Sequence, residues 1–183
     1  MNLVRGDFLN FNPDEIFKQP FAIIGNFPYN ISSQIFFRVL DLRDSVVEIS
    51  GMLQKEVAQR ICSGPGSKTY GILSVLLQTF FNIEYLFDVS PDVFYPKPKV
   101  VSAVIRLRRN NVTDPGCDFA LMRRIVKATF NQRRKMIRNS IKAVCDMGDD
   151  SCELMLKRPE QLSVDEFVKL TNLVQESLLK RNS

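Results

Sequence analysis

The feature that most constrains the fold of this chain is a short apolar run that stops at a stiff polar loop. Residues 21–24 are apolar and are typical of a buried strand, which ends at Gly25. The next four residues are Asn-Phe-Pro-Tyr. Pro28 has a fixed φ angle and pushes Phe27 toward an extended conformation, so the chain cannot turn directly into a helix. The pattern predicts a loop at the carboxyl end of a strand, where open α/β sheets bind their ligands.

Three groups on this loop suit a flat ring that carries an amino group. The carboxamide of Asn26 and the carbonyl of Pro28, which we expect to be free, can each accept an amine hydrogen. The ring of Tyr29 offers a face for stacking. The loop therefore predicts a site for a flat ring that carries an amino group. The alternative is that Tyr29 is an ordinary core aromatic, as most of the 14 Phe must be.

Residues 26–33 read Asn-Phe-Pro-Tyr-Asn-Ile-Ser-Ser, and this segment resembles a motif of the ribosomal RNA adenine dimethyltransferases. That group comprises the KsgA family and its erythromycin-resistance relatives. Three further blocks, at residues 52–57, 94–102 and 130–140, are similar to segments of the KsgA family in the same order. The last block favours the KsgA family over the resistance methylases. The resemblance runs from about residue 3 to the C-terminus.

The resemblance implies an enzyme of ribosome biogenesis that uses S-adenosylmethionine to dimethylate adenines of small-subunit ribosomal RNA. It implies that Asn26 and Pro28 bind the amine, and that Tyr29 and Phe94 stack on the flipped base. It also implies that Asp7 and Asn26 contact the cofactor. Positioning and electrostatics can supply most of this catalysis, which agrees with a chain that contains no His.

In this family the cofactor pocket begins with a glycine-rich turn after the first strand. The 8 Gly of this chain form no such cluster, and Gly64-Pro65-Gly66 is typical of a turn because Pro lacks the N–H that a phosphate-type cradle needs. The resemblance places the missing loop ahead of residue 1. We therefore expect a fragment of a longer enzyme, with an incomplete cofactor pocket and no activity in isolation.

The pattern of apolar residues predicts both strands and helices up to residue 108 and helices alone after it. Strands are expected at residues 46–53, 80–89 and 100–107, and helices from Ser32 and over 56–61 and 70–79. We interpret Ser102 as a residue that continues the last strand. The prediction is an α/β fold. Residues 1–108 form the C-terminal half of a Rossmann-like S-adenosylmethionine-dependent methyltransferase sheet, and residues 109–183 form a small all-α RNA-binding domain.

Three helices are expected in the second part, over residues 119–130 and 137–144 and from Val164 onward. The stretch from residue 119 to 144 holds basic residues and no acid. A solvated helix usually mixes both signs, so this stretch predicts a polyanionic partner. The alternative is a basic surface without a partner. The predicted RNA-binding residues are Lys97, Lys99, Arg123, Arg124, Lys127, Arg133, Arg134, Lys135 and Arg138.

Composition excludes several other classes of protein. The four Cys form no C-x-x-C pair and His is absent, which argues against a zinc site and suits a reducing compartment. No apolar run approaches the length of a membrane span. We expect a cytoplasmic monomer without metal or membrane, bound to small-subunit ribosomal RNA or a pre-ribosomal particle. Two alternatives are a non-catalytic RNA-binding or assembly module and a large-subunit adenine methyltransferase of the resistance type.

Overall fold

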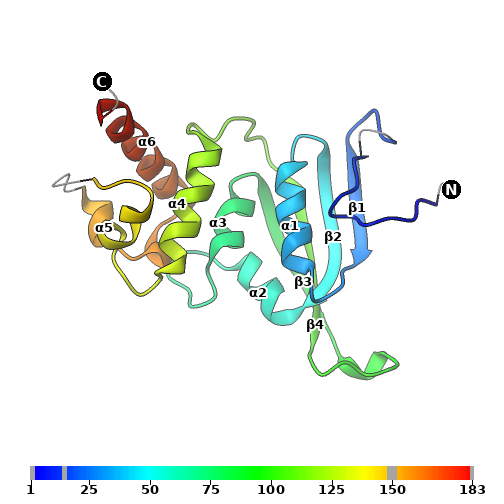
Figure 1. Ribbon diagram of the computed structural model, residues 1–183. Coiled ribbons are helices and arrows are strands. Elements are labelled where there is room, and N and C mark those ends of the chain that lie inside the picture. The colour runs from blue at the N-terminus through cyan, green and yellow to red at the C-terminus, as the bar shows by residue number, and fades with distance from the viewer. Residues whose placement is uncertain (1–2, 14–15, 148–151, 182–183) are drawn as a thin grey trace. The chain divides into compact units, whose positions relative to one another are not determined.

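The computed structural model describes residues 3–13, 16–147 and 152–181 (Figure 1). The chain divides into two compact units. One comprises Met1–Gln59 with Phe81–Asn111, and the other comprises Arg60–Phe80 with Val112–Ser183. Residues 60–80 therefore group with the helical part, which the sequence pattern did not indicate. The domain boundary between residues 108 and 109 stays a prediction.

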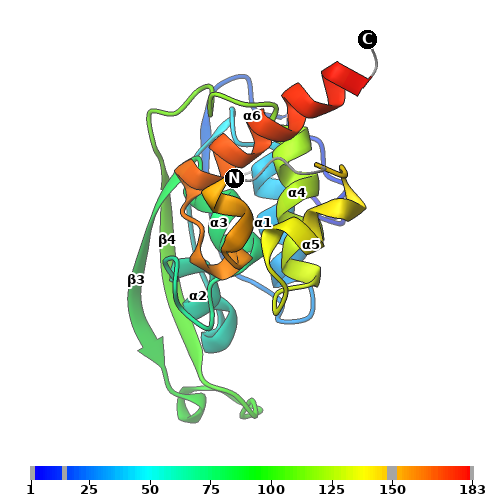
Figure 2. The ribbon, with the colours of Figure 1, turned by 90° about the vertical axis from the view of Figure 1, so that its left-hand side faces the viewer.

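The first unit is built on a four-stranded mixed sheet. Its strands are β1 (Phe21–Asn26), β2 (Val46–Gln54), β3 (Phe81–Val89) and β4 (Ser102–Arg109), in the order β1-β2-β4-β3. β1 and β2 are parallel, whereas β4 is antiparallel to both of its neighbours. Figure 2 shows β3 and β4 as one long paired ribbon. The predicted strands are confirmed, and the fold is the predicted α/β class.

The strand register brings four strand ends to one edge of the sheet. Asn26 at the end of β1 pairs with Met52 near the end of β2. Ser102 at the start of β4 pairs with Gln54 on one side and with Val89 on the other. Residues that are far apart in the sequence therefore meet at this edge. Ligands of open α/β sheets bind at such an edge.

Helix α1 (Ser32–Asp41) covers the sheet beside β1 and β2 (Figure 1). Four of its apolar residues recur at the spacing of one helical face and are at most 3% exposed: Ile35, Phe36, Val39 and Leu40. The ring of Phe36 meets the ring of Phe27 edge to face, with 5.8 Å between the centroids. This burial fixes the loop that follows β1 against the body of the unit.

The second unit is helical. α2 (Lys55–Cys62) begins in the first unit and ends in this one, and α3 (Ile72–Gln78) follows it. The later helices are α4 (Phe119–Asn131), α5 (Ile137–Ser140) and α6 (Val164–Arg181). Short 3-10 turns connect them: η3 (Ile141–Ala143), η4 (Glu153–Leu156) and η5 (Pro159–Gln161). The helix predicted over residues 137–144 is thus a short α-helix that tightens into a 3-10 turn.

Aromatic rings and a capping box hold this unit together. The ring of Phe130 lies 6.0 Å from the ring of Tyr70 and 6.0 Å from the ring of Phe167, centroid to centroid. At the start of α6, the Ser163 N–H donates to Glu166 Oε2 at 2.9 Å, and the Glu166 N–H donates to Ser163 Oγ at 3.2 Å. A hydrogen bond from Lys157 holds the pKa of Glu166 below its usual value. The predicted helix start is confirmed.

Candidate active site

The loop after β1 is anchored by its own backbone. The Phe27 N–H donates to the Met52 carbonyl at 2.9 Å, and the Ile31 N–H donates to the Pro28 carbonyl at 3.2 Å. The expectation of a free Pro28 carbonyl was therefore wrong, because a turn closes on it. A carbonyl oxygen has a second lone pair, so Pro28 can still accept one more hydrogen. Asn26, the last residue of β1, is exposed and keeps its side chain available.

Two glycines make room for the Phe27 ring inside the first unit. Gly25 and Gly51 lie opposite each other in the register of β1 and β2. A Cβ atom on Gly51 would lie 2.3 Å from Phe27 Cε2 and 2.7 Å from the Gly25 carbonyl oxygen. Any side chain at position 51 would therefore displace the ring. Because Phe27 is only 7% exposed, its packing holds the adjacent Asn26 and Pro28 in place.

Tyr29 is tied to the sheet through its hydroxyl group. A hydrogen bond joins the Tyr29 hydroxyl to the hydroxyl of Ser102, which is fully buried at the start of β4. The interpretation of Ser102 as a residue that only continues a strand was incomplete, since its side chain also contacts the loop after β1. Ser102 is the last residue of the block at residues 94–102, and this position was the only sequence signal of the contact. The contact itself was not predicted.

Phe94 lies in the connection between β3 and β4. It directly follows the short turn η2 (Pro91–Val93), and its N–H donates to the Pro91 carbonyl at 3.2 Å. The side chain is partly exposed. The connection leaves β3 and rejoins β4 at the same sheet edge that carries Asn26. Phe94 and Tyr29 therefore belong to loops that start from one edge, and a shared stacking role stays a prediction.

The two lysines of the same connection differ in their surroundings. Lys97 donates a hydrogen bond to Asp92, which lowers the pKa of that carboxyl group below its usual value. Both side chains are well exposed, so the ion pair is weak and RNA phosphates can compete with it. Lys99 is exposed. RNA binding by either residue stays a prediction.

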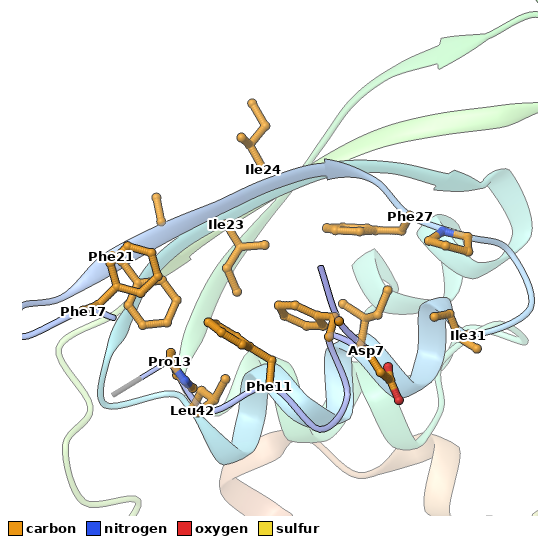
Figure 3. Close-up of a pocket in the computed structure, with 15 residues that line it drawn as sticks. Asp7, Phe11, Pro13, Phe17, Phe21, Ile23, Ile24, Phe27, Ile31 and Leu42 are labelled. Carbon is orange, nitrogen blue, oxygen red and sulfur yellow. The ribbon is translucent and has the colours of Figure 1, made fainter. Parts of the chain in front are cut away.

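A cavity of about 580 Å³ runs along β1 and α1 within the first unit (Figure 3). Its walls are mostly apolar, and Figure 3 shows the Ile23 side chain pointing into it. Asp7, Phe27 and Pro28 line it together, whereas Asn26 is not among the lining residues. The Asp7 carboxylate accepts the Leu9 N–H at 3.0 Å and the Asn10 amide at 2.8 Å. The cavity can hold a flat ring beside an exposed carboxylate.

The predicted RNA-binding residues of the second unit fall into two groups. Arg123 and Arg133 are partly buried, and the exposed members are Arg124, Lys127, Arg134, Lys135 and Arg138. Arg133 Nη2 donates to the Ser67 carbonyl at 3.0 Å, and Arg133 Nε lies 3.9 Å from Glu160 Oε2. The Gly66 N–H donates to the Glu160 carbonyl at 2.6 Å. Arg133 therefore ties the turn after α4 to the loop around Gly66.

This geometry predicts a stability role for Arg133. We expect Arg133→Ala to lower the free energy of unfolding by about 1–2 kcal/mol, because it leaves a partly buried carbonyl without its charged donor. Arg134→Ala, in an exposed neighbour, should change it by less than about 0.5 kcal/mol. Urea unfolding of both variants measures the difference. Equal stability of the two variants would contradict the structural role.

Three further features concern metal binding, thiol reactivity and membrane insertion in the part of the chain that the structure describes. Within residues 3–13, 16–147 and 152–181, no group of three His, Cys, Asp or Glu side chains could hold a metal ion. Burial raises the pKa of the Cys62 thiol to about 11, which makes it a poor nucleophile at neutral pH. None of the helices in the described ranges is long and apolar enough to cross a membrane.

Comparison with known families shows to which family this chain belongs. The sequence profile of the family described as ribosomal RNA adenine dimethylase matches residues 1–178. This chain belongs to that family. The resemblance that the motifs indicated is thereby confirmed at the level of the family. The Asn26–Tyr29 loop and the Phe94 block are accordingly parts of a methyltransferase of ribosomal RNA.

Curated relatives in this family carry the name ribosomal RNA small subunit methyltransferase A. The protein from Bacteroides thetaiotaomicron is 55% identical over 97% of this chain and 67% of its own length. The protein from Bacteroides fragilis is 56% identical over 97% of this chain and 66% of its own length. The chain thus spans about two thirds of the length of these relatives.

Solved structures agree on the fold. A dimethyladenosine transferase from Plasmodium falciparum superposes with a TM-score of 0.78 at 20% identity, over 97% of this chain and 72% of that one. The 23S rRNA methyltransferase ErmE superposes with a TM-score of 0.58 at 26% identity, over 91% of this chain and 71% of that one. The methyltransferase fold predicted from the sequence is confirmed.

Proposed function

We propose that this chain carries the base-binding part of an enzyme that dimethylates the exocyclic amine of adenines in small-subunit ribosomal RNA. The observation that carries the proposal is the loop after β1, which is held by buried contacts at Phe27 and at Tyr29. These contacts leave Asn26 and Pro28 exposed at the sheet edge. Recognition of an amine requires hydrogen-bond acceptors that are exposed and held in a fixed position.

Asn26 and Pro28 act on the amine. The amino group of adenine is a poor nucleophile, because its lone pair is delocalised into the ring. When the Asn26 side-chain oxygen and the second lone pair of the Pro28 carbonyl accept its two hydrogens, the lone pair becomes localised on the nitrogen. Neutral acceptors do this without the desolvation penalty of a carboxylate. Positioning therefore replaces a general base, in a chain that contains no His.

Tyr29 and Phe94 capture the base. Extruding a nucleotide from a stacked helix costs a few kcal/mol, and stacking on an aromatic side chain returns about 1–3 kcal/mol per base. Tyr29 is already fixed in the structure, whereas Phe94 lies in a loop with a partly exposed side chain. We expect Phe94 to close over the base after Tyr29 has received it.

The cavity along β1 fits the adenine end of S-adenosylmethionine. Its apolar walls suit a flat ring, and the exposed Asp7 carboxylate at its rim can accept a hydrogen bond while it keeps its local turn. Asp7, Phe27 and Pro28 would hold that end of the cofactor, and Asn26 would lie next to it along the loop. When bound, the cofactor supplies an electrophilic methyl group on a sulfonium centre. The residues of this chain position the amine.

The exposed basic residues of the second unit would bind the phosphates of the same RNA. We expect a variant that removes four of these charges to bind a small-subunit RNA fragment more weakly and with a flatter salt dependence. The slope should fall by roughly 0.7–0.9 log units for each phosphate that is no longer neutralised. Arg133 is left intact, because its removal would also weaken the fold. The four changes are Arg124→Ala, Arg134→Ala, Lys135→Ala and Arg138→Ala.

The control for this variant removes the same amount of charge from exposed lysines outside the acid-free stretch. Titrations at several salt concentrations should leave its slope nearer to the wild-type value. Equal slopes for the two quadruple variants would mean that net charge alone sets the affinity. The control changes are Lys18→Ala, Lys68→Ala, Lys169→Ala and Lys180→Ala.

The direct test of the function is methylation mapping. Unmethylated small and large ribosomal subunits are incubated with S-adenosylmethionine and the form of the enzyme that carries the whole cofactor pocket. Mass spectrometry should find dimethyladenosine in the small subunit only. Modification of the large subunit would support the resistance-type reaction instead. Binding of RNA without any modification, and without cofactor binding in calorimetry, would support a non-catalytic assembly module.

A further inference from the structure

The bond between Tyr29 and Ser102 connects two segments of the active site that lie far apart in the sequence. Ser102 is fully buried, and its hydroxyl group meets the hydroxyl group of the partly buried Tyr29. Ser102 also ends the connection that carries Phe94, because β4 begins with it. One hydrogen bond therefore links the loop of the first stacking residue to the root of the loop of the second.

Ser102 is a rigid anchor. It is paired with Gln54 of β2 on one side and with Val89 of β3 on the other. β4 is an inner strand of the sheet, so its backbone cannot follow the movement of a loop. A hydroxyl group on such a strand has a fixed position, and it can therefore fix the group that it binds.

The other hydrogen bonds around Tyr29 in the described part of the chain act on the backbone. The backbone around it is held, since Ser32 Oγ donates to the Tyr29 carbonyl at 3.2 Å and the Phe27 N–H donates to Met52 at 2.9 Å. These bonds fix where the side chain starts, but they do not fix the direction of the ring. The hydroxyl group at the far end of the ring does so, because a ring held at both ends cannot swing about its Cα–Cβ bond.

We propose that Ser102 is a positioning residue, which sets the plane of the Tyr29 ring for stacking of the target base. The proposal rests on the proposed function, because it assumes that Tyr29 receives a base. Stacking uses the face of the ring, so the hydroxyl group is not required for the contact itself. It is required for the orientation. This assigns the Tyr29 hydroxyl a role that an ordinary stacking aromatic would not need.

The first test follows the ring without RNA. The chain contains four Tyr, so fluorine NMR of protein labelled with 3-fluorotyrosine should give four resonances, and Tyr29→Phe identifies the one that belongs to Tyr29. Ser102→Ala should shift and narrow that resonance as the ring gains freedom. Ser140→Ala is the matched control. It removes another fully buried hydroxyl group, which donates to carbonyls of its own helix region, at 3.2 and 3.3 Å. An unchanged Tyr29 resonance in Ser102→Ala would overturn the proposal.

The second test measures base capture. A small-subunit RNA fragment carries 2-aminopurine at the adenine that methylation mapping identifies, and stacking on Tyr29 quenches its fluorescence. Ser102→Ala and Tyr29→Phe should each weaken the quenching-derived affinity about two- to tenfold, while total RNA binding stays unchanged. The double variant should be no worse than either single one, because both changes remove the same bond.

The outcomes separate this proposal from the proposed function. Additive effects in the double variant, or a Ser102→Ala variant that quenches like the wild type, would overturn the positioning role alone. Absence of quenching by the wild type would overturn base capture itself, and the NMR result would still decide whether Ser102 orients the ring. If Ser102→Ala fails to fold, Tyr29→Phe tests the same bond with Ser102 left in place.

Discussion

Replacement of Asn26 by Ala should lower turnover by on the order of 10²- to 10³-fold while RNA affinity stays within about twofold of the wild type. The amide accepts a hydrogen from an amine that becomes a nucleophile, so its contribution is largest in the transition state. Asn26 is exposed at the end of β1, and its removal opens no cavity in the core. Stability should therefore be almost unchanged.

The measurement compares the kcat of methyl transfer with the Kd for RNA, in the form of the enzyme that carries the whole cofactor pocket. A fall in kcat at constant Kd identifies an interaction made mainly in the transition state. Asn82→Ala is the control, because it removes an exposed amide from β3 of the same sheet. Unchanged turnover of the Asn26 variant would remove Asn26 from the mechanism.

Replacement of Gly51 by Ala should have the largest effect on the structure of the site. The added Cβ would lie 2.3 Å from the Phe27 ring and 2.7 Å from the Gly25 carbonyl, closer than atoms can approach. The ring must leave its place between the sheet and α1, and the loop after β1 must move with it. Overpacking of this kind costs about 1–3 kcal/mol of unfolding free energy. Base capture should be abolished even where the protein still folds.

Two variants test whether the ring is the cause. Gly64→Ala is the control, since a Cβ there meets no atom within 4 Å, and urea unfolding should show little change. Phe27→Leu removes the outer atoms of the ring, so the double variant with Gly51→Ala should be more stable than the sum of the two single effects predicts. Additive effects would show that the clash with the Gly25 carbonyl, and not the ring, dominates.

Local residue patterns were sufficient to predict the secondary structure and the loop. The apolar run before Gly25, the fixed φ of Pro28 and the helical spacing after Ser32 each act within a few residues, and the structure confirms β1, the loop and α1. The start of the last helix at Val164 was predicted from local residues for the same reason. Local backbone geometry depends on residues that are neighbours in the sequence, so it can be predicted from the sequence alone.

Contacts between distant residues could not be predicted in this way. Arg133 was expected to bind RNA, which stays a prediction, and the structure shows that it also donates to the carbonyl of Ser67, 66 residues earlier in the chain. Whether an arginine binds a carbonyl or a phosphate depends on which loop folds back beside it. The residue type is the same in both cases.

The sequence by itself determined that this protein has a strand ending in a rigid Asn-Phe-Pro-Tyr loop, and the family follows from that loop and the three blocks after it. Only the tertiary structure decided how the loop is held. The register of β1 and β2 sets Gly25 opposite Gly51 and so creates the space for Phe27. The register of β4 places Ser102 at the edge where Tyr29 can reach it. Strand register results from pairing across the whole sheet, and no local pattern encodes which two residues will be opposite each other.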